Sequence, residues 1–219
     1  MFAAVFESVF KRKETKIFLG LSVLPALLYA MGTFFAGVNF NQITADKGTL
    51  SLLDFLSLLS LLFTMIDSIL LPMIAFVYLT VTVFTRERDD HTLFLYKDLN
   101  RTKVFWAKLG SLVLVLVMFF TLFLLVGILV YYSRVTAFLY ASGKVFGNLA
   151  AENLSNIASL SSSFVNFLFF LLVTAFLALR VKKGLTIFIT IVLDLIVLFT
   201  AGGDSVLRFL LPKAYGASW

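Results

Sequence analysis

The sequence lacks cysteine, has a single histidine and carries few charges, and each shortage excludes a class of protein. With no cysteine, the chain has no disulfide framework, no thiolate metal site and no cysteine nucleophile. One histidine, His91, excludes a multi-histidine metal cluster. Charged residues make up 14% of the chain and hydrophobic residues 61%, whereas soluble domains carry about 25% charged and about 45–50% apolar residues. The composition therefore excludes an ordinary soluble domain, a disordered chain and a collagen-like repeat.

What the chain does contain is long apolar stretches, each without Lys or Arg in its middle. Five of them are long enough to cross a bilayer: Ile17–Val38, Leu61–Thr85, Val104–Tyr132, Phe164–Val181 and Gly184–Ala201. A hydrocarbon core of about 30 Å needs about 20 helical residues at about 1.5 Å each. The sequence predicts an all-α polytopic membrane protein in which residues 1–219 form a single transmembrane domain. We expect five spans, or six if the chain continues.

The 18 basic residues are distributed unevenly between the segments that join these stretches. If the N-terminus is cytoplasmic, Lys47, Arg134, Lys144, Arg208 and Lys213 lie outside, and the other 13 of the 18 lie inside. Cytoplasmic segments of membrane proteins carry an excess of Lys and Arg. We therefore expect a multi-pass protein of a bacterial plasma membrane, with a cytoplasmic N-terminus. Its net charge of +6 would face anionic lipid headgroups and not nucleic acid.

Residues 1–15 precede the first span and carry an apolar stripe. The stripe consists of Phe2, Val5, Phe6, Val9 and Phe10, at positions i, i+3, i+4, i+7 and i+8. This spacing is typical of an amphipathic helix that lies in the cytoplasmic membrane interface with its phenylalanines at the acyl boundary. The alternative is a frayed, partly ordered terminus.

The segments on the predicted outer side are less regular. The run Leu50–Ser60 is either an outer interfacial helix or the first turns of a long second span, and Pro72 should kink that span. The polar stretch Ser133–Ser163 is expected to be an extracellular loop with a short helix. Tyr131 and Tyr132 are expected to end the third span in an aromatic belt at the membrane surface.

Asp194 lies about ten residues into the fifth predicted span, close to the membrane midplane. Ionisable groups at this depth are costly, and they are usually paired, protonated or part of a pathway. Since no Lys or Arg lies at matching depth, we expect its partners to be neutral polar residues such as Asn166, Thr174 or Thr190. Asp194 and Asn166 are the candidates for an intramembrane polar site. That site either forms a helix-packing hydrogen bond or contacts substrate or couples protons.

The segment 86–103, between the second and third spans, combines dense charge with apolar side chains. Charged residues dominate its start, and then Leu93, Leu95 and Leu99 interrupt a segment that has no membrane to enter. Exposed apolar patches mark interaction surfaces, and groove-binding helices use apolar anchors at this kind of spacing. The segment is therefore expected to form a short cytoplasmic docking helix. The alternative is an ordinary solvated loop that holds two helices in register.

The order of residues in this region resembles a known family. Glu87 and Arg88 are followed by Thr92 and Leu93, then by Leu99, Asn100 and Arg101, then by Phe105 and Lys108. This order resembles permeases of the ABC type-2 exporter family, which carry a charged cluster, a Gly-Thr-Leu-like turn, a short helix, a Ser/Asn-Arg pair and Phe-x-x-Lys. The sequence departs from the pattern at His91, where Gly is usual, and at Lys97-Asp98, where Thr-Pro is usual. Residues 1–15 similarly resemble the family's interfacial elbow helix.

The resemblance implies a permease subunit, which works with a second permease subunit as a homodimer or heterodimer and with cytoplasmic ABC ATPase subunits. The residues that it implies for ATPase coupling are Glu87, Arg88, Thr92, Leu93, Leu95, Leu99 and Arg101. It also implies export of amphipathic peptides (bacteriocin, antimicrobial or toxin-like) or of lipophilic compounds. This chain would then be a transport subunit and not an enzyme, without a cofactor of its own.

The sequence itself agrees with that division of labour. It contains no G-x-x-x-x-G-K-[ST] phosphate loop, so ATP and Mg would bind the partner ATPase. Two alternative classes of function are a membrane enzyme and a non-transporting subunit. A membrane enzyme needs paired Glu and His or a His-bearing phosphate site on its spans, which His91 alone does not supply. The remaining alternative is a non-transporting subunit that anchors or regulates a sensor complex.

Overall fold

A computed structural model describes residues 2–35, 53–89, 101–137 and 141–201 of the chain. Its helices are α1 (Phe2–Phe10), α2 (Lys13–Phe35), α3 (Phe55–Ile69), α4 (Leu71–Asp89), α5 (Arg101–Ser133), the short 3₁₀ helix η3 (Val135–Ala137), α6 (Ala150–Arg180) and α7 (Lys183–Ala201). Within these ranges no strand forms, apart from one isolated bridge between Leu53 and Ala141. The predicted all-α class is confirmed.

Three helices are long and apolar enough to cross a membrane, over Lys13–Gly32, Thr102–Ser133 and Ala150–Arg180. The pair α3 and α4 adds a fourth if the two are taken as one broken span. The protein is therefore membrane-embedded by the length and composition of its helices. The fifth predicted span corresponds to α7, which is not among those helices in the described part of the chain. A bundle of five spans remains a prediction.

The second predicted span, Leu61–Thr85, is not one straight helix. It is divided into α3 and α4, whose segments Phe55–Ile66 and Leu71–Thr85 meet at 66°. The break lies at Leu70, which has φ 57°, a left-handed conformation that side chains with a Cβ rarely adopt. Pro72 follows in the first turn of α4, where its missing N–H costs nothing. Proline thus begins the second helix, whereas the sequence led us to expect a kink inside one helix.

The fourth predicted span also differs, because α6 begins at Ala150 and not at Phe164. The sequence predicts that the polar residues before Phe164 belong to an outer loop, but 150–163 are part of the same uninterrupted helix. This stretch contains neither Gly nor Pro, and Asn156 is bonded to α3 through Ser57 and Ser60. With 31 residues, α6 is about 46 Å long, well beyond the bilayer core of about 30 Å.

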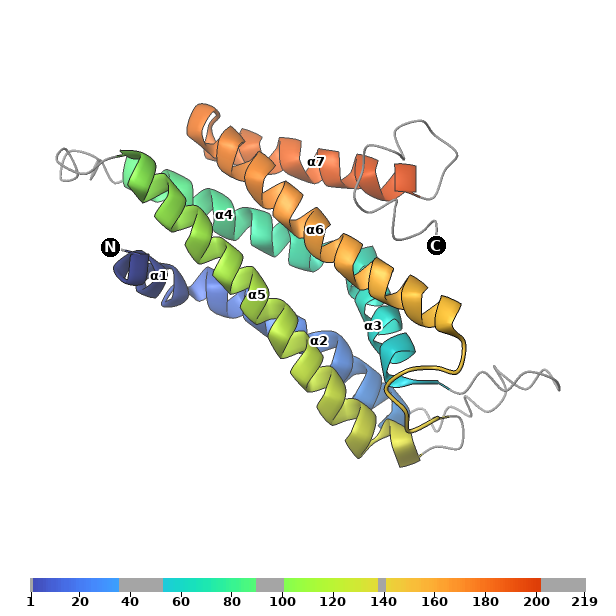
Figure 1. The fold of residues 1–219 in the computed structure, drawn as a ribbon. Helices are drawn as coiled ribbons and strands as arrows, with labels where there is room; N and C mark the ends of the chain where they lie inside the picture. Colours follow the sequence, from blue (N-terminus) through green and yellow to red (C-terminus); the bar gives the residue numbers. More distant parts are fainter. Residues whose placement is uncertain (1, 36–52, 90–100, 138–140, 202–219) are drawn as a thin grey trace.

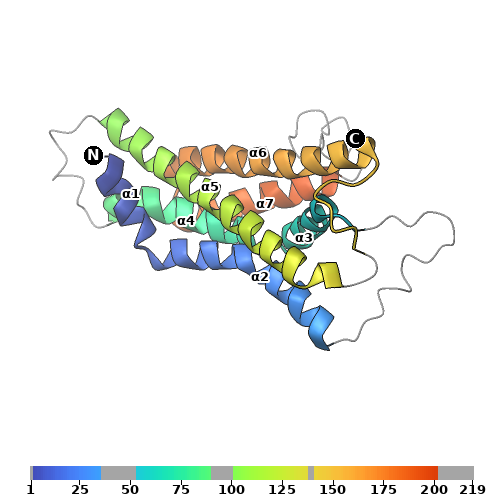
Figure 2. The same cartoon turned by 60° about the horizontal axis from the view of Figure 1, so that its bottom comes forward.

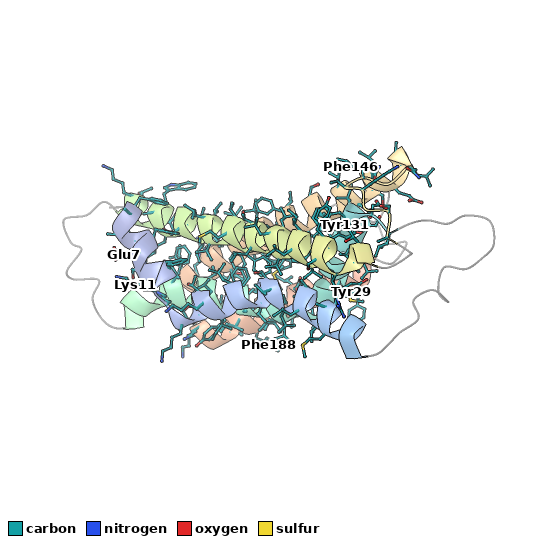
Figure 3. All side chains as sticks on the ribbon, turned by 90° about the horizontal axis from the view of Figure 1, so that it is seen from below. Glu7, Lys11, Tyr29, Tyr131, Phe146 and Phe188 are labelled. Atoms are coloured by element: carbon teal, nitrogen blue, oxygen red, sulfur yellow. The ribbon has the colours of Figure 1, made fainter. Side chains whose placement is uncertain are left out.

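The helices pack around an aromatic interior, and α5 runs diagonally across the others (Figure 1). Phe18 of α2 stacks on Phe76 of α4 and on Phe119 of α5, with ring centroids 4.9 and 4.5 Å apart. Phe167 of α6 joins Phe76 and Phe119 at 5.8 and 6.2 Å. One cluster of rings therefore joins four helices. Many other large apolar side chains remain exposed on the outside of the bundle, as Phe188 does in Figure 3.

The ends of the bundle differ in charge. The N-terminus, α1, the end of α4, the start of α5 and the α6–α7 turn all lie at one end (Figures 1 and 2). The described basic residues of these segments and of the start of α2 are Lys11, Arg12, Lys13, Lys16, Arg86, Arg88, Arg101, Lys103, Lys108, Arg180, Lys182 and Lys183. We call this end the basic end. The opposite end holds α3's first turn, η3 and the start of α6.

Candidate functional site

Three of the seven predicted ATPase-coupling residues lie at the basic end, on α4 and α5. Glu87 and Arg88 lie in the last turn of α4, and Arg101 is the first residue of α5. The remaining four residues, Thr92, Leu93, Leu95 and Leu99, lie outside the described residues. The structure therefore brings both flanks of the predicted docking segment to the same end of the bundle.

Helix α1 lies against α5 and α2 at this end. Its Phe2, Phe6 and Phe10 form a row in which successive ring centroids are 6.5 and 5.8 Å apart. The Phe2 ring covers Gly110 of α5, because a Cβ at Gly110 would lie 3.1 Å from Phe2 Cε2. Val9 is fully covered, whereas Phe2 and Phe10 stay partly exposed. The phenylalanine row thus contacts α5 as well as the surroundings of the bundle.

The corner between α1 and α2 is bonded to α4. The Arg12 guanidinium donates from Nη1 to the carbonyl oxygen of Thr82 at 3.1 Å. Thr15 Oγ1 donates to the Val9 carbonyl at 2.6 Å, and Lys11 Nζ donates to Glu7 Oε1 at 2.6 Å. Figure 3 shows Glu7 and Lys11 together at this end. A guanidinium near the C-terminal part of a helix also interacts favourably with the helix dipole.

The neighbouring ends of α4 and α5 meet through Phe84, Phe105 and Lys108. The rings of Phe84 and Phe105 are 5.5 Å apart, and Lys108 Nζ lies 5.8 Å from the centroid of Phe84. Lys108 is buried. Phe105 and Lys108 belong to the order of residues on which the resemblance rests, but Phe84 and Arg12 were missed. An amphipathic terminus and an apolar span give no sign of which of their residues meet across sequence distance.

A second group of polar residues lies inside the bundle, on α6 and α7. Asp194 is 5% exposed and Asn166 is 2% exposed, and Thr174, Thr186 and Thr190 are fully buried. We call these five residues the polar seam. Thr186, Thr190 and Asp194 are four residues apart on α7, so they lie on one face of that helix. The elements that pack against α7 are α4 and α6, so this face is directed into the bundle.

The opposite end is held by hydrogen bonds that the sequence did not predict. Tyr131 is buried, and its hydroxyl donates to the carbonyl oxygens of Leu53 and Lys144 at 3.1 and 3.3 Å. Its predicted place in an aromatic belt is therefore wrong, because a neighbouring loop covers it. Asn153 pairs with both backbone groups of Gly147, each at 2.9 Å. A pocket of about 370 Å³ opens beside them, lined by Ser57, Ala151, Glu152, Ser155 and Asn156.

Comparisons with protein-family models, with curated proteins and with solved structures found no match to this chain. Within the described residues, no group of three or more His, Asp or Glu side chains is arranged to hold a metal ion. The arrangement offers two kinds of chemistry. The basic end brings the charged end of α4 close to the start of α5, and the polar seam presents hydrogen-bonding groups inside an apolar bundle.

Proposed function

We propose that the chain is the permease subunit of an ATP-driven ABC exporter. The single observation that carries this proposal is that the end of α4 and the start of α5 lie together at the basic end, beside α1 and the α6–α7 turn. A partner bound at this end would contact four segments at once. Movement of the partner could therefore reach α4 and α5 directly and α2 through Arg12 and Thr82.

In this proposal the N-terminus is cytoplasmic and five spans cross the plasma membrane. A separate ATPase binds and hydrolyses ATP with Mg, and two permease subunits, alike or different, enclose the path. Glu87, Arg88 and Arg101 contact charged groups on the ATPase, while Leu93, Leu95 and Leu99 supply most of the docking energy because they are apolar. Thr92 belongs to the turn that precedes the docking helix.

The proposed cargo is an amphipathic peptide of the bacteriocin, antimicrobial or toxin-like kind, or a lipophilic compound. Support comes from the apolar character of the bundle, whose aromatic interior joins four helices and whose outside exposes large apolar side chains. Such surfaces suit cargo that already partitions into membranes, and they suit ions and sugars poorly.

Co-purification tests the proposal. A tagged chain should bring down an ABC ATPase encoded beside it, and Leu93→Asp with Leu95→Asp should reduce the recovered ATPase at least about tenfold, a loss of about 1.4 kcal/mol of binding. The matched control is Val145→Asp with Phe146→Asp, two exposed apolar residues at the opposite end. If both double variants retain the ATPase equally, the docking assignment is wrong.

ATP hydrolysis by the purified pair in lipid then separates transport from anchoring. A permease should raise the ATPase rate when cationic amphipathic peptides are added, because cargo binding and hydrolysis are coupled. A complex that binds ATPase but whose rate responds to no peptide or lipophilic compound would favour the non-transporting sensor subunit.

A further inference from the structure

The α6–α7 turn carries three positive charges within four residues. They belong to Arg180, the last residue of α6, to Lys182 in the turn and to Lys183, the first residue of α7. We call these three residues the cationic turn. Arg180 and Lys182 are exposed, and Lys183 is half-buried. In the part of the chain that the structure describes, none of the three forms an ion pair with a carboxylate. Their charge is therefore available to an anionic partner.

Two of these cations lie where positive charge is unfavourable for α7. Lys182 and Lys183 stand at the start of that helix, where free backbone N–H groups already carry partial positive charge. An acidic residue in the first turn of α7 would offset this charge, and that turn contains none. The two lysines thus do not stabilise the helix that they begin, so their position calls for another explanation.

Two of the three cations are held against exposed aromatic rings. Arg180 Cζ lies 4.9 Å from the centroid of the Phe176 ring on α6, and Lys183 Nζ lies 5.0 Å from that of Tyr78 on α4. Phe176 is 57% exposed and Tyr78 41% exposed, so both charges lie at the outside of the bundle. Cation–π contacts restrict side chains that would otherwise move freely in water. Binding of an anion to the turn therefore costs less side-chain entropy.

Exposed apolar side chains continue from the turn along both helices. Those nearest the turn are Leu172, Phe176 and Leu179 on α6, and Leu185, Phe188 and Val192 on α7. Successive members are three or four residues apart, so each set forms a row along one side of its helix. Each row is about 10 Å long, within the ~15 Å of hydrocarbon that one leaflet provides. Positive charge at one end of an exposed apolar row fits an amphiphile with an anionic head.

We propose that the cationic turn binds the headgroup of an anionic phospholipid, whose acyl chains lie along the apolar rows of α6 and α7. A headgroup with net negative charge supplies the counter-charge that the turn lacks, whereas phosphatidylcholine is neutral overall. A second copy of the chain fits this face less well, because a two-fold dimer formed through it would bring two like-charged turns together. The lipid site needs no ATPase, so it goes beyond the proposed function and is tested in this chain alone.

Fluorescence quenching by labelled lipid gives the test, because the chain contains no native cysteine to interfere. Leu185→Cys, beside the turn, is labelled with monobromobimane, whereby the thiolate forms a thioether and bromide leaves. The labelled full chain is placed in phosphatidylcholine nanodiscs that contain increasing fractions of doxyl-labelled phosphatidylglycerol or doxyl-labelled phosphatidylcholine. Quenching at each fraction gives the relative affinity of this face for the two lipids. We expect the anionic lipid to bind at least about fivefold more tightly, because each Lys or Arg near the membrane surface adds to the attraction.

Controls separate the cationic turn from the general charge of the basic end. Replacing all three residues of the turn with Gln should lower the preference below about twofold. The matched control replaces Lys13, Lys16 and Lys103 with Gln, which removes three exposed cations of the same end, and it should retain the preference. A label at Leu129→Cys, an exposed position of α5 near the opposite end, should show no preference. Added salt should weaken the preference at the turn, because it screens exposed charges.

Four results would overturn the inference. Equal affinities for the two lipids, or a preference that survives the triple Gln variant, would mean that the turn does not select an anionic headgroup. Loss of the preference in excess glycerol 3-phosphate would mean a phosphate site that does not use acyl chains. Protection of the label from both lipids would mean that protein, such as a second copy, covers this face.

Reserve variants keep the test decisive. Leu179→Cys serves as the label position if Leu185→Cys does not elute as a folded particle, and Lys182→Gln with Lys183→Gln replaces the triple variant in the same case. The expected and the contrary results stay the same for both. Failure of an ATPase to co-purify, by contrast, would overturn only the proposed function.

Discussion

Two interior regions of this bundle are equally buried and differ in what their side chains leave unsatisfied. The aromatic cluster of Phe18, Phe76, Phe119 and Phe167 joins α2, α4, α5 and α6 through ring contacts alone. Such residues need only neighbours of the right shape. The polar seam of α6 and α7 needs hydrogen bonds as well, and Asn166 Oδ1 and Thr174 Oγ1 do not have them. The first region stabilises the fold, whereas the two unpartnered atoms of the second reduce its stability.

Truncation inside the aromatic cluster should have the largest effect on stability. Phe119→Ala removes a fully buried ring that contacts rings of two other helices, and it should destabilise the protein by about 3–5 kcal/mol because a cavity remains. Thermal unfolding of the detergent-solubilised protein measures this change. Leu172→Ala, at an exposed position of α6, is the control and should cost much less. Equal losses at the two positions would contradict the assignment of the cluster as the packed core.

The close contact between α5 and α3 predicts a smaller loss of stability than truncation of the aromatic cluster. A Cβ at Gly127 of α5 would lie 2.6 Å from Leu59 Cδ2 of α3, and Leu59 is itself buried. Gly127→Ala should therefore destabilise by about 1–3 kcal/mol through overpacking. Gly20→Ala is the matched control in α2, where nothing lies within 4 Å, and it should be neutral or slightly stabilising. A neutral Gly127→Ala would mean that α3 and α5 can separate freely.

Removal of an unpaired hydroxyl from the polar seam should raise stability where the other two substitutions lower it. Its effect should be the smallest of the three. Thr174→Val removes an unpaired hydroxyl, and valine has nearly the same shape as threonine. The unfolding temperature of the variant should therefore stay level or rise, by an amount equivalent to about 1 kcal/mol. Thr190→Val removes a hydroxyl that is bonded to the Thr186 carbonyl, so it should not be stabilising. The same melting assay compares the two variants. A clear loss of stability in Thr174→Val alone would show that its hydroxyl has a structural partner.

Much of the fold follows from apolar run length, because backbone groups in lipid must be satisfied within a helix. The third predicted span, Val104–Tyr132, differs from α5 by three residues at its start and one at its end. Run length could not reveal the break at Leu70, because Pro72 is compatible both with a kinked helix and with the start of a new one. It also could not reveal that α6 continues through polar residues, because that continuation depends on contacts with α3.

The candidate sites, like the fold, follow partly from the sequence and partly from contacts between distant parts of the chain. Hydropathy placed Asp194 and Asn166 in apolar spans, but the burial of Thr186, Thr190 and Asp194 as one row depends on the packing of α7 against α4 and α6. The order of residues around Glu87 and Arg101 suggested a docking segment. Nothing in the sequence indicated that Arg12 would lie near this segment. Arg12 is bonded to the carbonyl of Thr82 in α4, which is 70 residues later in the chain.

Composition and the spacing of apolar residues by themselves determined that this protein is helical and membrane-embedded, since both properties depend on local hydrogen bonding and on transfer of side chains from water. The tertiary structure decided which faces are buried, where the second span breaks and which segments meet at the basic end. Those features depend on shape and contact between residues far apart in the chain. Two helices with the same hydropathy can therefore enclose a packed aromatic cluster in one place and an unsatisfied polar seam in another.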